Sequence, residues 1–314
     1  MELKWFKYLD NNSKMSAEST SNTATQNYTG GPLTLELVKR YSSQILLKDS
    51  DPETDLSLFC YNKCTTNSEN AVKSCRGVVF QGNNLVMQAF PFTQEFSEKD
   101  VDDIKQTLEP VFDKCLFFES EEGACIRMFA VKIPGTEQVK WYTSTNRKLD
   151  AFKSKWASRE SFGTGFIKAL EEEVRYTPEL AQAVGEHTTG QSLLDTFQRN
   201  CLNPDTQYMF LIRHTPENRI VCNAPAKPRV FHVGSFRDNK LFFDPICIPM
   251  PTQHKFSSVD EMLDYVSKIN FSFHQGIIVF APENRQYKIF QSNYYELFCA
   301  RGNERSIKYR YLQV

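Results

Sequence analysis

The chain has 314 residues, of which 40% are hydrophobic and 24% are charged, and its formal net charge is −1. This is the composition of an ordinary globular protein, and it excludes a disordered chain and a nucleic-acid binder with a basic field over its whole surface. No apolar run approaches the roughly 20 residues of a membrane span, and the N-terminus lacks the apolar core of a secretory signal, so we expect no membrane association.

The first 32 residues are mostly small and polar and end in Gly30-Gly31-Pro32, which predicts a flexible N-terminal segment over residues 1–32. A helix is predicted over 33–47, with the folded body starting near Asp55. Strands 76–81 and 85–90 flank Gly82-Asn83-Asn84, a hairpin signal. Ser97 and Asp100 have the spacing of a helix start, and Val101, Ile104 and Leu108 follow at helical intervals.

The remaining chain reads as strands interrupted by helices. Strands 116–119, 124–131 and 139–145 are predicted to form an antiparallel meander, and helices are predicted at 147–174, 178–185 and 189–200. Further strands are predicted at 208–213, 219–222, 230–236, 240–243, 275–280 and 285–290, with helices near 258–268 and 292–299. The order lacks strict βαβ alternation, which predicts one α+β domain over residues 33–314 with mostly antiparallel sheets.

Nine scattered cysteines, an odd number without a disulfide framework, indicate reduced thiols and a cytoplasmic location. Cys60, Cys64 and Cys75 form the only cluster. Because a zinc site needs four ligands and no fourth is near, we predict no metal site.

Three stretches carry cations where a phosphate could bind. Arg76 precedes Gly77 at a strand start, and a glycine there allows close approach to the backbone. The densest basic stretch follows strand 139–145 and includes Lys148, Lys155 and Arg159 beside Trp156, a mixture suited to phosphates and bases. Lys288 lies inside an apolar strand, where an unpaired charge is costly. Each also has a plain alternative: a surface arginine, a solvated basic helix and a paired core lysine.

The order of six motifs resembles the phage-type RNA ligases of the covalent nucleotidyltransferase superfamily, in a diverged branch such as large DNA viruses carry. The matching stretches are CRGVVF with FPFTQEF, ESEEGACIRMF, WYTSTNRKLDAF, YMFLIRHTPENRIV, HQGIIVF and YKIF. The resemblance covers roughly Asp55 to the end and implies an RNA ligase-like fold, with ATP and Mg²⁺ as cofactors and RNA 5′-phosphate ends as partners. It also implies a further C-terminal RNA-binding domain, which we expect this chain to lack.

The resemblance assigns roles to particular residues. The nucleophilic lysine position holds Ser120, and Glu122 corresponds to the motif's aspartate. The positions implied to bind nucleotide are Arg76, Gly123, Thr145, Arg147, Gln275 and Lys288. Besides Ser120, three further positions depart from the family pattern: Leu211 and Gln275 replace carboxylates, and Phe290 replaces a second lysine.

These departures predict that the lysyl-adenylate chemistry is lost. The family enzymes attack the ATP α-phosphate with a lysine amine, and the resulting phosphoramidate releases AMP on protonation. A serine would form an ordinary phosphodiester, a much poorer donor, and loss of the glutamate at Gln275 removes charge that would hold Mg²⁺. Three functions stay open: a ligase-like nucleotide-binding protein, a non-catalytic nucleic-acid-end binder or scaffold, and altered transferase chemistry on the same fold.

The basic stretch carries a separate prediction about RNA. If residues 147–160 are helical, Lys148, Lys155 and Arg159 form one stripe beside Trp156. Such a stripe would contact about three phosphates of a single strand.

Overall fold

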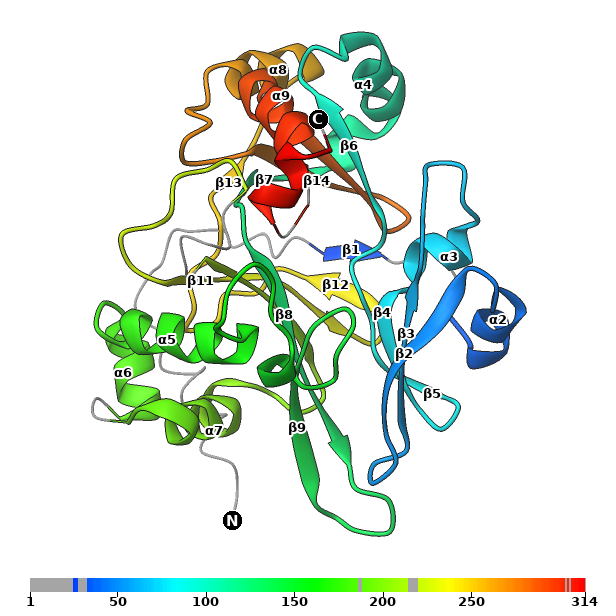
Figure 1. Ribbon diagram of the computed structural model, residues 1–314, viewed down its shortest axis with the longest axis vertical. Helices are drawn as coiled ribbons and strands as arrows, with labels where there is room; N and C mark the ends of the chain where they lie inside the picture. The colour runs from blue at the N-terminus through cyan, green and yellow to red at the C-terminus, as the bar shows by residue number, and fades with distance from the viewer. Residues whose placement is uncertain are drawn as a thin grey trace.

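A computed structural model describes residues 25–27, 33–185, 188–213, 220–302, 304 and 306–313. Three β-sheets, each with helices packed against it, make up this part of the chain (Figure 1). The predicted α+β class with antiparallel-rich sheets is confirmed. No helix within the described residues is long and apolar enough to cross a membrane.

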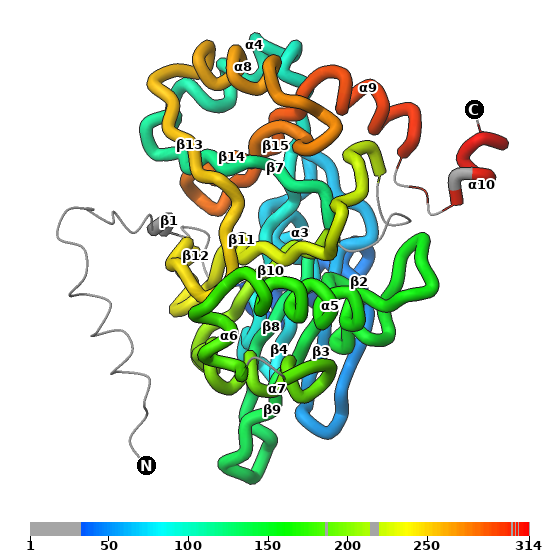
Figure 2. Tube along the Cα trace, turned by 90° about the vertical axis from the view of Figure 1, so that its left-hand side faces the viewer, coloured from blue at the N-terminus to red at the C-terminus, as the bar shows by residue number. Residues whose placement is uncertain are grey.

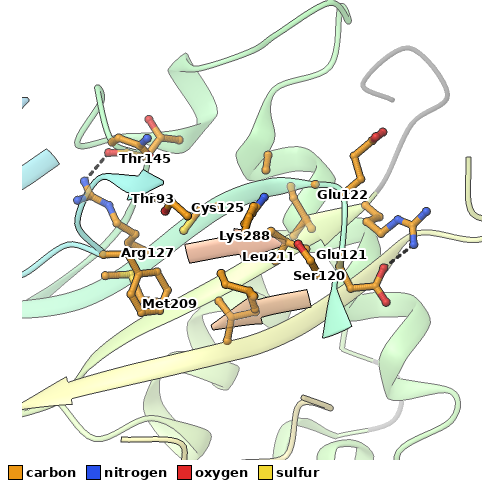
Figure 3. A pocket seen from close by; sticks show the side chains of 18 of the residues that line it. Thr93, Ser120, Glu121, Glu122, Cys125, Arg127, Thr145, Met209, Leu211 and Lys288 are labelled. Carbon is orange, nitrogen blue, oxygen red and sulfur yellow. Dashed lines mark hydrogen bonds and ion pairs between the residues drawn. The ribbon is translucent and has the colours of Figure 1, made fainter. Parts of the chain in front are cut away.

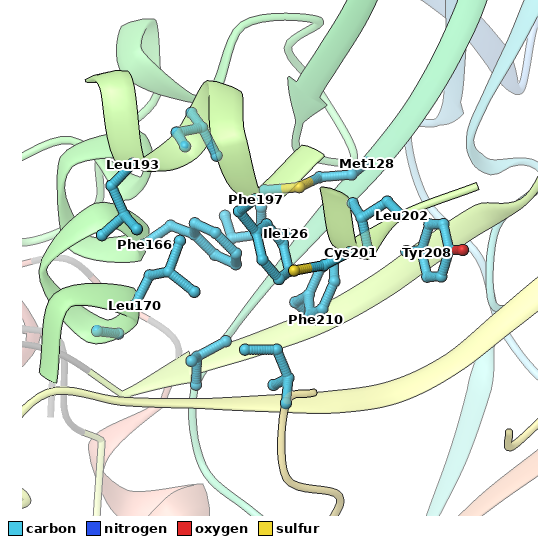
Figure 4. Close-up of a cluster of buried hydrophobic side chains, with 14 of the residues drawn as sticks. Ile126, Met128, Phe166, Leu170, Leu193, Phe197, Cys201, Leu202, Tyr208 and Phe210 are labelled. Atoms are coloured by element: carbon cyan, nitrogen blue, oxygen red, sulfur yellow. The ribbon is translucent and has the colours of Figure 1, made fainter. Parts of the chain in front are cut away.

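The largest sheet is antiparallel throughout and consists of β1 (Thr25–Asn27), β12 (Lys240–Phe242), β11 (Arg229–Arg237), β10 (Gln207–Arg213), β8 (Ala124–Lys132) and β9 (Val139–Ser144), in spatial order. Its outer face is covered by α5 (Phe162–Val174), α6 (Pro178–Val184) and α7 (Gly190–Cys201). Phe166, Phe197 and Phe210 pack edge-on and tilted between helices and strands in this core (Figure 4).

The five-stranded sheet has the order β13 (Gln253–His254), β7 (Leu116–Ser120), β14 (Gly276–Ala281), β15 (Arg285–Phe290) and β6 (Thr93–Ser97). Only the β15–β6 pair among these strands is parallel. Its far face packs against α4 (Val101–Leu108), the 3-10 turn at Glu109–Lys114 and α8 (Val259–Ser267) (Figure 2). The chain continues from β15 into α9 (Ser292–Arg301) and α10 (Ile307–Tyr311).

The four-stranded sheet consists of β2 (Ile45–Asp51), β3 (Leu56–Tyr61), β4 (Arg76–Gln81) and β5 (Asn84–Met87). It packs against α2 (Leu35–Arg40) and α3 (Asn70–Ser74). The predicted hairpin around Gly82-Asn83-Asn84 is confirmed as the β4–β5 pair.

Several predicted elements differ from those in the structure. The helix expected over 33–47 ends at Arg40, and residues 45–51 pair with β3, so the folded body begins well before Asp55. Of the predicted flexible segment, residues 25–27 form a strand on β12, and the rest lies outside the described residues. The strand expected at 219–222 is a series of bends where it is described, at 220–222.

The helix expected to start at 147 begins only at Phe162. Asp150 accepts a hydrogen bond from the backbone of Phe152 and caps a short 3-10 turn, Ala151–Lys153. Ala157 then has a φ of 54°, in the left-handed region, which ends any helical run. Ser161 accepts from the backbone of Thr164 and caps α5.

The predicted meander is wrong at its first strand, and this defines the site. β7 pairs with β14 and β13 in the five-stranded sheet, whereas β8 pairs with β9 and β10 in the six-stranded sheet. The turn Glu121-Glu122-Gly123 therefore carries the chain from one sheet to the other and is not a hairpin. A Cβ on Gly123 would lie 2.4 Å from the carbonyl oxygen of Ile212, so only glycine fits this crossing without displacement.

Candidate functional site

A cavity of about 840 Å³ lies between the six-stranded and five-stranded sheets (Figure 3). One wall carries Phe118, Ile278 and Phe280, and the facing wall carries Met209 and Leu211. Apolar walls with a few polar groups are the usual lining of a small-molecule site.

The alternation of side chains along strands decides which residues face this cavity. Successive residues of a strand point to opposite faces, so Gln286 and Lys288 share the cavity face of β15 while Tyr287 and Ile289 pack in the core behind it. The same rule on β7 places Ser120 on the face of Phe118. Lys288 is therefore turned toward the cavity by the periodicity of its own strand.

Ser120, at the lysine position of the resemblance, is the last residue of β7 and is only 2% exposed. Its hydroxyl donates to Oε1 of Gln275 at 2.9 Å, and the same oxygen accepts from Nζ of Lys288 at 2.9 Å. Gln275 completes the group by donating from Nε2 to the Tyr294 hydroxyl at 2.6 Å. Because its proton is directed to an amide oxygen, which is a weak base, Ser120 is not activated as a nucleophile.

Lys288 carries the positive charge of this group. Burial lowers its pKa below the ordinary lysine value. Its ammonium group also lies 5.6 Å from the ring centroid of Phe290, the residue at the family's second lysine position. The Phe290 ring thus makes a cation–π contact with Lys288, at a position where the resemblance implies a second lysine.

The carboxylate of Glu122 is buried and fully engaged by the protein. It accepts hydrogen bonds from the backbone N–H groups of Ile220, Val221 and Cys222 at 2.5, 2.8 and 3.1 Å, and from the Tyr294 hydroxyl at 3.0 Å. These bonds hold residues 220–222 out of a strand. Glu122 therefore fixes one wall of the cavity instead of offering a free carboxylate to a ligand.

The neighbouring Glu121 forms a second ion-paired group at the cavity edge. It lies 2.6 Å from Nη1 of Arg213 and 3.1 Å from Nδ1 of His274. Burial by itself would raise the pKa of Glu121, but the bond from His274 and the charge of Arg213 outweigh it and lower that pKa. The same bond raises the pKa of His274.

Among the described residues, Glu119, Glu121 and His274 are the candidate ligands for the Mg²⁺ that the resemblance implies. Glu119, Glu121 and His274 bring their ligand atoms within 4.8 Å of one another. Mg²⁺ prefers oxygen ligands, whereas here a histidine supplies one of three groups and Arg213 already neutralises Glu121. The residues do not fit a protein-held Mg²⁺, and no step of the proposed function depends on one.

Arg127 was not recognised from the sequence, yet it organises the cationic side of the cavity. It is 2% exposed and donates to the carbonyl oxygens of Gly77 and Thr145, which joins β4 to the end of β9. Burial lowers its pKa to about 10. The backbone at Gly77 approaches that of Asn146 closely, since a Cβ on Gly77 would lie 2.6 Å from the Asn146 backbone. This is the kind of close approach that a glycine permits. Arg76 and Arg147 flank the two joined segments and are thereby brought to one cavity.

The basic stretch contributes less than predicted. Lys155 and Trp156 line the cavity, and Arg301 lies 6.0 Å from the Trp156 ring. Lys148 is instead 3.8 Å from Asp49, and Arg159 is exposed away from the cavity lining. Because residues 147–161 are not one helix, the stripe of Lys148, Lys155 and Arg159 does not form.

The other predicted site residues come together from distant parts of the chain. The cavity is lined by Arg76, Ser120, Glu122, Gly123, Thr145, Arg147, Lys155 and Lys288, and Gln275 bonds to two of them. Leu211, at a position where the resemblance implies a carboxylate, lines the cavity. Thr93, Arg127 and Gln286 also line it and were missed. Lys288 was singled out because it is a charged residue inside an apolar strand. Arg127 has the same position in β8 and could have been found in the same way.

Comparisons with known proteins place the chain near a group of viral proteins. It is 30% identical over 253 residues to the immediate-early protein ICP-46 homologue of Invertebrate iridescent virus 3, covering 79% of this chain and 52% of that protein. It is 29% identical to the homologue of Invertebrate iridescent virus 6 (93% and 62% covered) and 22% identical to ICP-46 of Frog virus 3 (76% and 58% covered). The chain spans about half the length of the curated relatives it matches. No protein-family model matches it.

Among solved structures, the chain is similar to one described as a putative ATP-dependent DNA ligase from Aquifex aeolicus. The TM-score is 0.48 at 13% identity, with 84% of this chain and 64% of that chain covered. The three sequence relatives are viral, in agreement with the viral branch expected from the motifs. None of these four proteins is a phage RNA ligase, so that narrower resemblance stays a prediction.

Proposed function

We propose that this chain is a ligase-like protein that binds a nucleotide in the cavity between the six-stranded and five-stranded sheets. Because position 120 holds serine and not lysine, the protein does not form a lysyl-nucleotide intermediate there. The observation that carries the proposal is the convergence of Arg76, Arg147 and Lys288 on one cavity. These three cations are far apart in the sequence, and each lies at a position that the motif resemblance implies to bind nucleotide.

The cavity has a cationic part, suited to phosphates, and apolar walls, suited to a base. Guanidinium and ammonium groups are donors only, so they attract phosphate oxygens, and a low-dielectric surrounding strengthens that attraction. The aromatic and aliphatic walls suit a base. The charge of Glu121 is paired with Arg213, and the carboxylate of Glu122 is held by backbone N–H groups of residues 220 and 221.

Removing the charge of Arg76 or of Lys288 is expected to weaken nucleotide binding by about tenfold or more, since a charge-assisted hydrogen bond contributes roughly 1.5–3 kcal/mol. We would measure ATP and GTP affinities by calorimetry for the wild type, Arg76→Ala and Lys288→Met. Titrations in MgCl₂ and in EDTA would show whether the ion that accompanies the phosphates contributes.

Arg159→Ala is the matched control, because Arg159 is exposed and does not line the cavity. It should bind nucleotide as tightly as the wild type. Unchanged affinity in both cavity variants would remove the cavity as the binding site, and absence of binding by the wild type would overturn the proposed function.

A non-catalytic nucleic-acid-end binder is the second candidate, favoured by Lys155 and Trp156 at the cavity edge. Arg147 and Lys155 together would neutralise about two phosphates, which predicts a log–log salt slope of about −1.4 for a single strand. Trp156 offers a stacking surface for one base.

Affinity for a short 5′-phosphorylated RNA should fall in an Arg147→Ala, Lys155→Ala, Trp156→Ala variant and persist in Lys148→Ala, Arg159→Ala. We would measure both at several salt concentrations by fluorescence anisotropy. The reverse pattern would place the RNA surface outside the cavity edge. No binding by the wild type at low salt would exclude this candidate.

A further inference from the structure

Tyr294 lies behind the cavity and is hydrogen-bonded to two groups at its walls. The residue is fully buried in α9, and its ring lies 5.2 Å from that of Phe290 and 6.0 Å from that of Phe298. Its hydroxyl accepts from Nε2 of Gln275 at 2.6 Å and donates to Oε2 of Glu122 at 3.0 Å. Neither Tyr294 nor Gln275 is among the described residues that line the cavity. An effect of these two residues on a ligand must therefore pass through a residue that does.

The charged groups at the two ends of this hydrogen-bonded chain agree on its direction. An ammonium group can only donate, so the atom of Gln275 that lies 2.9 Å from Nζ of Lys288 is the amide oxygen. An ionised carboxylate can only accept, so the Tyr294 hydroxyl gives its hydrogen to Glu122 and accepts from the amide nitrogen of Gln275. Both ends favour the same orientation of the Gln275 amide, with its oxygen toward Lys288.

The backbone of Gln275 is held independently of its side chain. Its N–H donates to the carbonyl oxygen of Ser120 at 2.9 Å, and its carbonyl oxygen accepts from the N–H of Gln291 at 3.0 Å. Loss of the Tyr294 hydroxyl would leave these backbone bonds in place and would free the side-chain torsions of Gln275. The amide oxygen could then turn away from Lys288.

The amide oxygen holds Lys288 without neutralising its charge. Lys288 lines the cavity (Figure 3), and because an amide is uncharged, the ammonium group keeps its positive charge for an anion. A carboxylate at position 275, which the motif resemblance implies, would pair with that charge. The glutamine therefore suits a lysine that binds a phosphate.

We infer that Tyr294 is a positioning residue for Lys288: through the Gln275 amide it holds the ammonium group where a phosphate of the bound nucleotide would lie. Gln275 then acts on the nucleotide through Lys288, in place of the direct contact that the motif resemblance implies. The inference rests on the proposed function, since it explains how one of the three cations of the cavity is oriented.

A double-mutant cycle separates this role from a general effect on the fold. We would measure ATP and GTP affinities by calorimetry for the wild type, Tyr294→Phe, Lys288→Met and the variant with both changes. Tyr294→Phe removes only the hydroxyl and should weaken binding about fivefold. In the Lys288→Met background the same change should alter the affinity less than about twofold, because the group on which it acts is gone. Tyr295→Phe is the matched control, since it removes a hydroxyl from the next residue of α9, and it should bind as the wild type does.

A measurement without nucleotide tests the same link. In protein labelled with ¹⁵N-lysine, NMR would follow the ammonium group of Lys288, identified by the signal that Lys288→Met lacks. In the wild type this group should be less mobile than that of Lys153, whose side chain is 79% exposed. Its mobility should rise in Tyr294→Phe and stay unchanged in Tyr295→Phe.

The outcomes separate the inference from the function on which it rests. If nucleotide binds and Tyr294→Phe has no effect, or weakens binding equally with and without Lys288, the inference is overturned and nucleotide binding stands. If no nucleotide binds the wild type, the proposed function is overturned, and the NMR comparison still decides whether Tyr294 holds Lys288. Where circular dichroism shows that Tyr294→Phe does not fold, Gln275→Leu takes its place in the cycle. A wild-type Lys288 ammonium group as mobile as that of Lys153 overturns the inference whatever the variants do.

Discussion

Replacing Glu122 with alanine is expected to lower the free energy of unfolding by about 3 kcal/mol or more. The change removes the acceptor of three consecutive backbone N–H groups, at residues 220–222, and of the Tyr294 hydroxyl. Four donors then lose their acceptor, and two of them, the backbone N–H of Cys222 and the Tyr294 hydroxyl, belong to fully buried residues. Urea denaturation followed by circular dichroism would measure the loss.

Two companion variants define its origin. Glu122→Gln keeps the shape and one acceptor oxygen, so it should lose less than alanine does. Glu137→Ala removes a carboxylate whose side chain is almost fully exposed and should leave the unfolding curve unchanged. A Glu122→Ala protein as stable as the wild type would show that Glu122 does not hold residues 220–222.

After incubation with ATP or GTP radiolabelled on the α-phosphate, the denatured protein is expected to carry no acid-labile, base-stable label. Such label marks a phosphoramidate, and the lysine that forms it in the resembled family is Ser120 here. The Ser120 hydroxyl also donates to the amide oxygen of Gln275, which is too weak a base to take its proton. Scintillation counting and peptide mass spectrometry would measure and map any label.

The position of any label would decide between the remaining chemistries. Acid-labile label on Lys288 or Lys114 would contradict the prediction and show that another lysine has replaced the missing one. Acid-stable label on Ser120 would instead support altered transferase chemistry. Lys288→Met is the control, since it removes the amine nearest to Ser120 in the hydrogen-bonded group.

Sequence patterns predicted correctly those helices, strands and turns that are determined by residues close together in the chain. The β4–β5 hairpin was predicted from the turn signal Gly82-Asn83-Asn84, and β15 was predicted from its apolar residues. The segment 147–161 was mistaken for helix because its composition permits one. The left-handed Ala157 and the caps at Asp150 and Ser161 stop it, and only the cap residues are visible in the sequence.

The site shows the same division. Arg76, Thr145, Arg147 and Lys288 were identified because their motifs keep a fixed order along the chain. The separation of β7 from β8 into two sheets could not be predicted, because it depends on pairing with β14, more than 150 residues away. The positions of Gln286 and Thr93 at the cavity were missed for a related reason, since the parallel β15–β6 pair sets them side by side.

If the cavity binds an anion as proposed, Arg127 would couple folding to ligand binding. Its charge is buried against two carbonyl oxygens, and within the described residues no carboxylate forms an ion pair with it. A buried cation without a counter-ion destabilises the empty protein. An anion in the cavity would relieve this cost, and any ligand that binds only the folded state raises its stability. The protein would then be most resistant to unfolding when its cavity is filled, so nucleotide concentration would govern its persistence as well as its binding.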